Sequence, residues 1–123
     1  AVEGFTESLA YELSFFGVRT KIVQPGYGPG TAFIANSSDR MKGLVPPSYA
    51  PYVDQITSGH AGAKTAVGDD VARAVFLAAT DGSKRLRYAA GPDAEDLAAM
   101  RRSQPGDDYL DTMRAFVGPK SPA

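Results

Sequence analysis

The chain has 123 residues, enough for one modest domain with a hydrophobic core. Its composition, 43% hydrophobic and 22% charged, is typical of a soluble globular protein. A formal net charge of −1 gives no electrostatic reason to expect nucleic acid or an anionic membrane as a partner. The absence of cysteine excludes disulfides and thiolate metal sites, and no apolar run approaches the roughly 20 residues of a membrane span. We therefore expect a soluble, cytoplasmic protein.

Residues 1–16 have the spacing of a helix with two stripes. One stripe is apolar and comprises Val2, Phe5, Leu9, Leu13 and Phe16. The other, roughly opposite, mixes small and aromatic residues and comprises Gly4, Ser8, Tyr11 and Phe15. A helix buried on two sides packs against its own sheet and against either a second helix of the domain or another subunit. No capping residue precedes this helix, so we expect its natural beginning to lie upstream.

A strand and a glycine-rich loop follow the first helix. Gly17 suits the position that closes the helix, and residues 18–23 are expected to form the strand. Pro25 has no N–H and is expected to stop the strand's hydrogen-bond ladder. The loop that follows carries glycines at positions 26, 28 and 30, which let a ligand approach the backbone closely. Ligands of open α/β sheets bind outside the carboxyl ends of strands, so this loop is a candidate binding site.

The rest of the chain alternates helices with one more strand. The long irregular region 24–65 is expected to hold short helices at 32–43 and 48–58. The further expected elements are an almost wholly apolar and well-buried helix that begins at Asp69 and Asp70, a strand at 86–90, a helix at about 94–103 capped by Asp93 or Asp96, a helix at 107–117 and a flexible tail at 119–123. Two strands joined through a helix predict a partial parallel sheet. Two strands alone cannot shield both faces of such a sheet, and more strands are needed. We therefore expect the sheet to be incomplete in this chain.

Common catalytic motifs are absent. The nearest match to a phosphate-binding P-loop, residues 59–65, has Ala63 in place of the second glycine. The dinucleotide fingerprint Gly-x-Gly-x-x-Gly is missing, and a single histidine, His60, in a chain without cysteine argues against metal ligation. No Gly-x-Ser-x-Gly elbow supports a serine nucleophile. We therefore expect no catalytic residue within the chain.

Several segments in combination resemble one enzyme family. The matching segments are Leu9-Ala10-Tyr11-Glu12-Leu13, Gly17-Val18-Arg19-Thr20, Val23-Gln24-Pro25-Gly26 with the downstream Thr31, Asp70-Val71-Ala72-Arg73-Ala74-Val75 and Leu86-Arg87-Tyr88-Ala89-Ala90-Gly91. In this order they resemble the part of a short-chain dehydrogenase/reductase that follows its active site. The resemblance implies an α/β fold, the C-terminal part of a Rossmann-like doubly wound parallel sheet. The resemblance covers about residues 1–95, and we expect residues 1–118 to form that part of one domain.

The resemblance also implies where the chemistry lies. In that family a Tyr-x-x-x-Lys motif precedes this first helix, and its tyrosine exchanges a proton with the substrate oxygen. None of the chain's six tyrosines has a lysine four residues later, and the family's phosphate-binding glycine turn is missing too. The chain is therefore expected to be the C-terminal half of an NAD- or NADP-dependent enzyme that acts on an alcohol or carbonyl compound. Alone it is expected to be inactive.

By the same resemblance, Pro25 and Gly26 would shape the wall beside the nicotinamide, and Thr31 would hydrogen-bond its carboxamide or a phosphate. The threonine usually stands four residues after the glycine but here stands five after it, with the extra residue expected to form a bulge at 28–30. Residues 32–62 would form a flap over the substrate. The expected substrate-lining residues are Tyr27, Phe33, Tyr49 and Tyr52. The first helix would pack against its mate in a homo-oligomer.

A different class of protein stays open. The alternative reading is a naturally short, non-catalytic α/β module that binds a partner through the first helix and the 24–65 loop. Such a module would fold cooperatively and remain monodisperse, whereas a half-enzyme would expose apolar surface and bind a hydrophobic dye. Neither reading gives the substrate, nor a choice between NAD and NADP.

Overall fold

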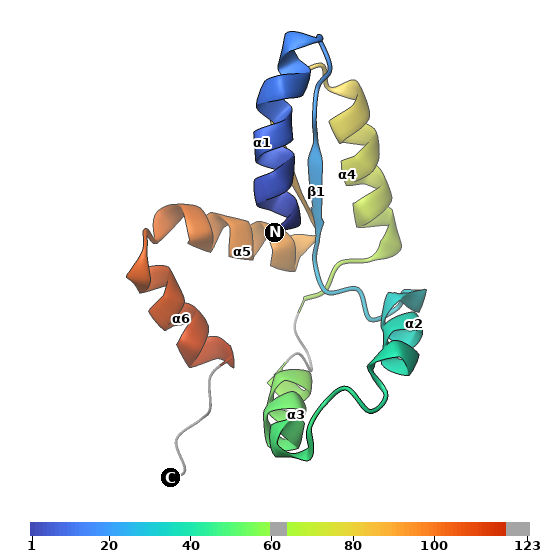
Figure 1. Ribbon diagram of the computed structural model, residues 1–123, viewed down its shortest axis with the longest axis vertical. Coiled ribbons are helices and arrows are strands. Elements are labelled where there is room, and N and C mark those ends of the chain that lie inside the picture. The colour runs from blue at the N-terminus through green and yellow to red at the C-terminus, as the bar shows by residue number, and fades with distance from the viewer. Residues whose placement is uncertain (60–63, 118–123) are drawn as a thin grey trace.

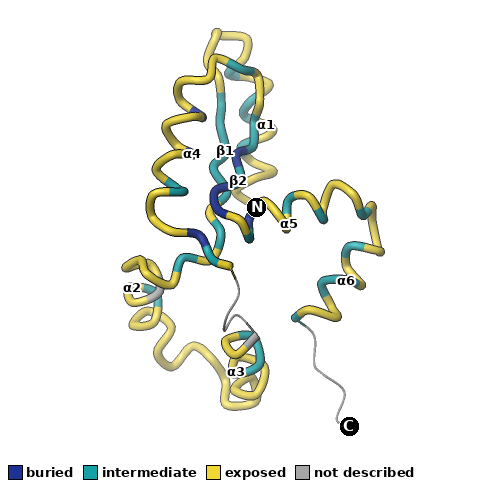
Figure 2. The backbone as a smooth tube through the Cα atoms, turned by 180° about the vertical axis from the view of Figure 1, so that it is seen from behind, coloured by how far each residue is buried: buried dark blue, intermediate teal, exposed yellow. Residues whose placement is uncertain are grey.

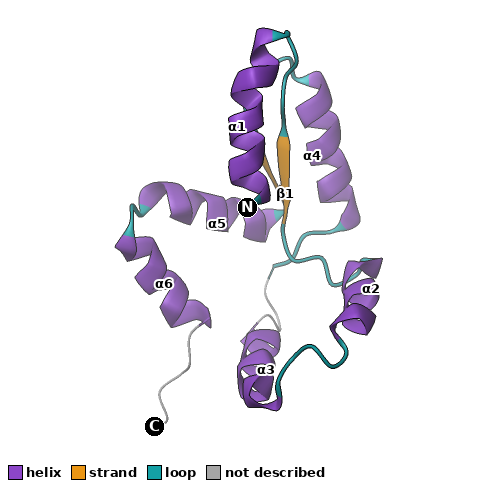
Figure 3. Cartoon of the chain, viewed as in Figure 1, coloured by secondary structure: helices purple, strands orange, loops and turns teal. Residues whose placement is uncertain are grey.

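The computed structural model describes residues 1–59 and 64–117 (Figure 1). In chain order the elements are α1 (Val2–Phe15), β1 (Ile22–Pro25), α2 (Ala32–Met41), a 3-10 helix (Pro47–Tyr49), α3 (Ala50–Gly59), α4 (Gly68–Thr80), β2 (Arg87–Ala90), α5 (Pro92–Ser103) and α6 (Asp107–Val117). The fold is therefore α/β and mostly helical, with a small sheet (Figure 3). Within these described ranges, no helix is long and apolar enough to cross a membrane. The predicted tail at 119–123 and His60 lie outside them.

The sheet consists of β1 and β2, which pair in parallel with Ile22 opposite Arg87 and Pro25 opposite Ala90. Parallel neighbours need a crossover connection, and here α2, α3 and α4 supply it. α4 packs against both strands, while α2 and α3 lie beyond the carboxyl ends of the strands (Figure 1). The parallel pairing that the sequence predicts is confirmed, as are the two short helices in the crossover.

The predicted position of β1, residues 18–23, is wrong, since β1 starts only at Ile22. The side chains of Arg19 and Lys21 donate hydrogen bonds to main-chain carbonyls of residues 82–85. These bonds hold the preceding segment beside the 82–85 loop, ahead of the ladder that β1 forms with β2. β propensity alone does not reveal such long-range side-chain anchors.

Pro25 is the last residue of β1 and does not stand after the strand as expected. Ile22 N–H donates to Leu86 O at 2.7 Å, and Gly26 N–H donates to Ala90 O at 3.0 Å. Alternate residues therefore donate toward β2, and the nitrogen of Pro25 faces the other way. A missing N–H there removes no bond of this ladder, which is why an edge strand tolerates the proline.

Helices cover both faces of the sheet. Tyr88 and Ala90 of β2 are buried on the α4 side, and successive side chains of a strand point to opposite faces. Arg87 accordingly points to the other face, where it forms ion pairs with Glu3 at 3.2 Å and Glu7 at 2.8 Å. Both glutamates belong to α1, so α1 and α4 lie on opposite sides of β1, as Figure 3 shows.

Local sequence signals correctly predict how two helices end or begin. Gly17 has a φ of 71°, and Val18 N–H donates to Leu13 O at 3.0 Å, which closes α1 in a Schellman motif. At the start of α4, the Asp70 carboxylate accepts a hydrogen bond from Val67 N–H at 3.0 Å. The negative charges predicted for this first turn are therefore confirmed, and their interaction with the helix dipole is favourable.

The buried core is small for a chain of this size. Among the residues that the structure describes, its members are Ala66, Ala74, Ala78, Tyr88, Ala90 and Ala94. The chain exposes 9441 Å², whereas a compact monomer of 12.9 kDa exposes only about 6,300 Å². Figure 2 shows the buried positions gathered at the sheet, in the helices beside it and in the loop that leads into α4. The fold therefore presents much more surface than a self-contained domain does.

The expectation that α4 is well buried is wrong. Only Ala74 and Ala78 of this helix are buried, and the Phe76 side chain is 70% exposed. A two-stranded sheet is narrow, so it covers one stripe of the helix and leaves the remaining apolar residues in solvent. α1 behaves similarly, because Leu9 is half-buried whereas Phe15, on its second stripe, is 86% exposed.

Candidate functional site

The candidate site is the loop that leaves β1 at the carboxyl ends of both strands. The hydrogen bond from Gly26 N–H to Ala90 O closes the sheet at this point. Beyond this bond the two segments of the chain diverge. β1 continues into the loop toward α2, and β2 continues into α5 (Figure 1). This divergence at the carboxyl ends of parallel strands is where ligands bind in open α/β sheets.

Asp93 holds the loop from the α5 side. Its Oδ2 accepts a hydrogen bond from Tyr27 N–H at 2.6 Å. A Cβ on Gly26 would overlap this carboxylate, so the glycine makes room for Asp93. The prediction that Asp93 or Asp96 caps α5 is wrong, because the N-cap is Gly91 and Asp93 lies within the first turn. The sequence pattern did not distinguish Gly91 from these two aspartates as the capping residue.

Ala66 holds the same loop from the α4 side. Its N–H donates to Tyr27 O at 3.1 Å, and the residue is only 4% exposed. Gly91, with a φ of 107°, passes so close that a Cβ there would overlap Ala66 Cβ. Both peptide groups of Tyr27 are thus fixed, one by each neighbouring segment. Sequence reasoning missed Ala66, since an alanine in an irregular stretch carries no local signal.

Thr31 closes a turn in the same loop. Its N–H donates to Gly28 O at 3.2 Å and its Oγ1 donates to the same carbonyl at 2.9 Å. Residues 28–31 therefore form a β-turn with Pro29 in the second position, which proline favours. This turn, in place of the expected bulge, absorbs the extra residue between Gly26 and Thr31. The threonine is exposed and stands at the N-cap of α2 without capping it through its side chain.

The predicted substrate-lining residues lie on separate elements beyond the sheet. Tyr27 follows β1, Phe33 is on α2, Tyr49 is in the 3-10 helix and Tyr52 is on α3. All four are exposed, and Phe33 most of all, at 77%. The structure does not gather them around either of the two cavities beside the sheet. Their role stays a prediction.

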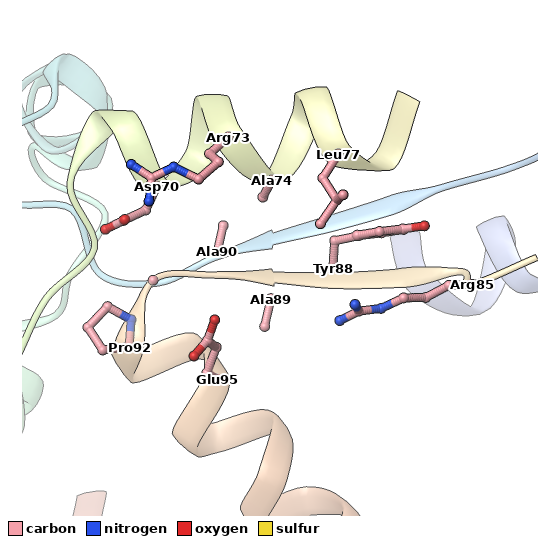
Figure 4. Close-up of a pocket in the computed structure, with 11 residues that line it drawn as sticks. Asp70, Arg73, Ala74, Leu77, Arg85, Tyr88, Ala89, Ala90, Pro92 and Glu95 are labelled. Carbon is pink, nitrogen blue, oxygen red and sulfur yellow. The ribbon is translucent and has the colours of Figure 1, made fainter. Parts of the chain in front are cut away.

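One cavity, of about 340 Å³, lies beside β2 between α4 and α5 (Figure 4). Charged side chains of both signs line it, with Asp70 and Arg73 from α4, Glu95 from α5, and Arg85. The Arg85 guanidinium stands 4.6 Å from the centre of the Tyr88 ring. A second cavity, of about 650 Å³, lies between α1 and the segments that lead into the strands. The sequence predicted neither.

A polar cluster sits at the opposite, amino ends of the strands, around the buried Tyr88 hydroxyl. Tyr88 donates to Asp81 Oδ2 at 2.5 Å and accepts from Lys21 Nζ at 2.8 Å. Lys21 also lies 3.4 Å from Asp81 Oδ1, and Ser83 Oγ donates to Asp81 at 2.8 Å. The Tyr88 hydroxyl, helped by Ser83, holds the pKa of the Asp81 carboxyl well below its ordinary value. The four polar groups satisfy one another, as a structural network does.

Comparison with known proteins identifies two similar chains. Two uncharacterized oxidoreductases of Schizosaccharomyces pombe (strain 972 / ATCC 24843) are each 30% identical to the chain over an alignment of 126 residues. The alignment covers 96% of this chain and 49% of each relative, so the chain spans about half the length of the curated relatives that it matches. No protein-family model matches the chain. No solved structure matches it either.

Proposed function

We propose that the chain is the C-terminal half of an enzyme of the short-chain dehydrogenase/reductase type. The intact enzyme transfers a hydride between NAD or NADP and an alcohol or carbonyl substrate. Similarity to two proteins named oxidoreductases, over half of their length, supports the class of reaction. The parallel strands with a helix on each face support a Rossmann-like sheet that further strands complete.

The observation that carries the proposal is the position of the Pro25–Thr31 loop. It leaves a parallel strand at its carboxyl end, beside the carboxyl end of the neighbouring strand. Pro25, Gly26 and Thr31 all belong to this loop, so they are the residues that would hold a nicotinamide bound outside this edge. These are the three residues for which the sequence resemblance implies a role at the cofactor.

The residues of the loop fit a nicotinamide. Pro25 offers an exposed ring without a polar N–H, which suits contact with a flat aromatic ring. The Thr31 hydroxyl donates to Gly28 O, so its oxygen still has lone pairs to accept a hydrogen bond from a carboxamide N–H. When bound, the nicotinamide supplies or takes up the hydride. This chain's residues would hold and orient the ring, while the groups that move the proton lie outside the chain.

The flap and the interface belong to the same proposal. Residues 32–62 contain α2, the 3-10 helix and α3, which lie beyond the carboxyl ends of the strands (Figure 1). From there Phe33, Tyr49 and Tyr52 would cover the substrate together with Tyr27. The chain exposes about half as much surface again as a compact monomer of its mass. That surplus favours a half-enzyme over a self-contained interaction module, and α1 is the helix proposed to meet a second subunit.

The proposal is tested on the intact protein with NADH and NADPH. We expect one of them to bind, with a change in nicotinamide fluorescence, and to be consumed with a panel of carbonyl compounds. Thr31→Val removes the hydroxyl and is expected to weaken cofactor binding about tenfold, the loss of one hydrogen bond to a ligand. Thr80→Val is the matched control, because Thr80 is also exposed and also bonds a local carbonyl, Phe76 O at 2.7 Å. No binding of either nucleotide by the intact protein would refute the proposal.

A further inference from the structure

The glycine at position 26 leaves space for a carboxylate of the same chain, that of Asp93. The space that a Cβ would take is filled by Asp93, whose three carboxyl atoms all lie there. The sequence suggested that Gly26 opens the loop to a ligand. In the structure the space beside Gly26 instead admits Asp93 from α5. The pair joins two segments that are 67 positions apart in the chain, at the carboxyl edge of the sheet.

The contact is built to hold the loop in one conformation. Asp93 Oδ2 accepts from Tyr27 N–H at 2.6 Å, a short distance typical of a hydrogen bond to a charged group. Asp93 Oδ1 is buried and accepts no hydrogen bond from any residue that the structure describes. Within the described residues, the hydrogen bond that this carboxylate accepts comes from Tyr27 N–H. The charge also stands in the first turn of α5, where the helix dipole favours a negative group.

The opposite side of the same peptide is fixed as well. Ala66 N–H donates to Tyr27 O, and Gly91 packs directly on Ala66. A residue whose N–H and C=O are both held by buried or half-buried neighbours cannot rotate without breaking two bonds. Of these two hydrogen bonds, the one to Asp93 involves a side chain, whereas the one from Ala66 joins two backbone groups. A side-chain substitution can therefore remove the Asp93 bond without altering the backbone.

We propose that Asp93 is a positioning residue, which sets the conformation of the Pro25–Gly26–Tyr27 wall through the Tyr27 amide. The part of this inference that concerns the nicotinamide rests on the proposed function; the hold on Tyr27 does not. Asp93 touches no reacting atom. Its effect is to present Pro25 and Gly26 in a fixed geometry, so its loss acts on cofactor affinity more than on turnover.

The test compares Asp93→Ala, Asp93→Asn and the control Asp96→Ala in the intact protein. Asp96 is an exposed carboxylate one turn further along α5. Two quantities are measured, the amide hydrogen-exchange rate of Tyr27 and the KM for the nicotinamide cofactor. Asp93→Ala is expected to raise both at least about tenfold with a smaller change in kcat, and Asp93→Asn to restore most of each because its carbonyl oxygen still accepts from Tyr27 N–H. Asp96→Ala is expected to leave both unchanged.

The outcomes separate this inference from the proposed function. Wild-type exchange at Tyr27 in Asp93→Ala, or an Asn variant no better than the Ala variant, overturns the role of Asp93. Faster exchange in a protein that binds no nicotinamide supports the hold on the loop and refutes the proposed function alone. If Asp93→Ala does not fold, Gly26→Ala is compared in the wild-type and Asp93→Ser backgrounds. A loss of stability that is equal in both backgrounds would overturn the inference too, since the shorter serine lacks the carboxyl group that the new Cβ would overlap.

Discussion

Gly91→Ala is the substitution for which the structure gives the sharpest expectation. Gly91 has a φ of 107°, a conformation that L-residues rarely adopt, and holding a non-glycine residue in a sparsely populated region costs about 1–3 kcal/mol. The new Cβ would also overlap Ala66 Cβ and stand 2.9 Å from Ala66 Cα. Ala66 is buried and bonded to Tyr27, so it cannot withdraw freely, and such overpacking costs about 1–3 kcal/mol more. The free energy of unfolding should therefore fall by about 2–6 kcal/mol.

Gly43→Ala separates the two contributions. Gly43 has a φ of 75°, and a Cβ there would meet nothing within 4 Å, so only the backbone strain applies. We expect a loss of about 1–2 kcal/mol for this control in urea denaturation of the intact protein. The double variant Gly91→Ala/Ala66→Gly should recover part of the difference, because it removes the nearest atom. A Gly91→Ala variant within about 0.5 kcal/mol of the control would refute the packing argument.

Two further predictions concern the charged groups around the sheet. Asp81, whose ordinary pKa is 3.8, has a lowered pKa in the folded protein, chiefly through the Tyr88 hydroxyl. Its stabilising effect is therefore complete above that ordinary value and is lost as the pH falls below it, so Asp81→Asn and Tyr88→Phe should each flatten the acid limb of a stability–pH curve; an unchanged limb in both would contradict this. Arg87→Met removes the ion pairs to Glu3 and Glu7 and should lower stability by about 0.5–1 kcal/mol at low salt. The same variant in 1 M NaCl should differ little from the wild type, and a loss that is independent of salt would show that packing, not charge, joins α1 to the sheet.

Sequence patterns predicted the elements well where the causes are local. The two stripes of residues 1–16, Gly17 after them, and the acidic residues at the start of α4 all act within a few positions, and the structure has α1, its Schellman end and α4 where they indicate. The parallel pairing also followed, because a strand, a helical crossover and a second strand admit few arrangements. Burial was harder to predict. An apolar helix body indicates a buried helix only when enough sheet exists to cover it, and two strands do not suffice.

The sequence predicted that the Pro25–Gly26 loop lies at the carboxyl end of a strand, but it did not predict the contacts that hold this loop. Pro25 and Gly26 marked the loop because their chemistry is visible in the sequence. Asp93 and Ala66, which hold it, lie 67 and 40 positions beyond Gly26 and come into contact with the loop only through the tertiary fold. A single sequence carries no signal for such pairs. The glycine pointed to a close approach, and the sequence alone could not tell a ligand from a carboxylate of the chain.

That distinction changes how a ligand would bind at the edge of the sheet. A loop kept flexible by glycines must be ordered when a ligand binds, and the ordering of each residue costs about 1–2 kcal/mol. Here the Tyr27 peptide is already bonded on both sides, and residues 28–31 are closed by the two bonds from Thr31 to Gly28 O. The cost of ordering is met when the chain folds, so a ring that docks against Pro25 keeps more of its contact energy as affinity. By our proposal Asp93 would contribute to this without touching a reacting atom, because its carboxylate fills the space beside Gly26 and accepts a hydrogen bond from Tyr27 N–H.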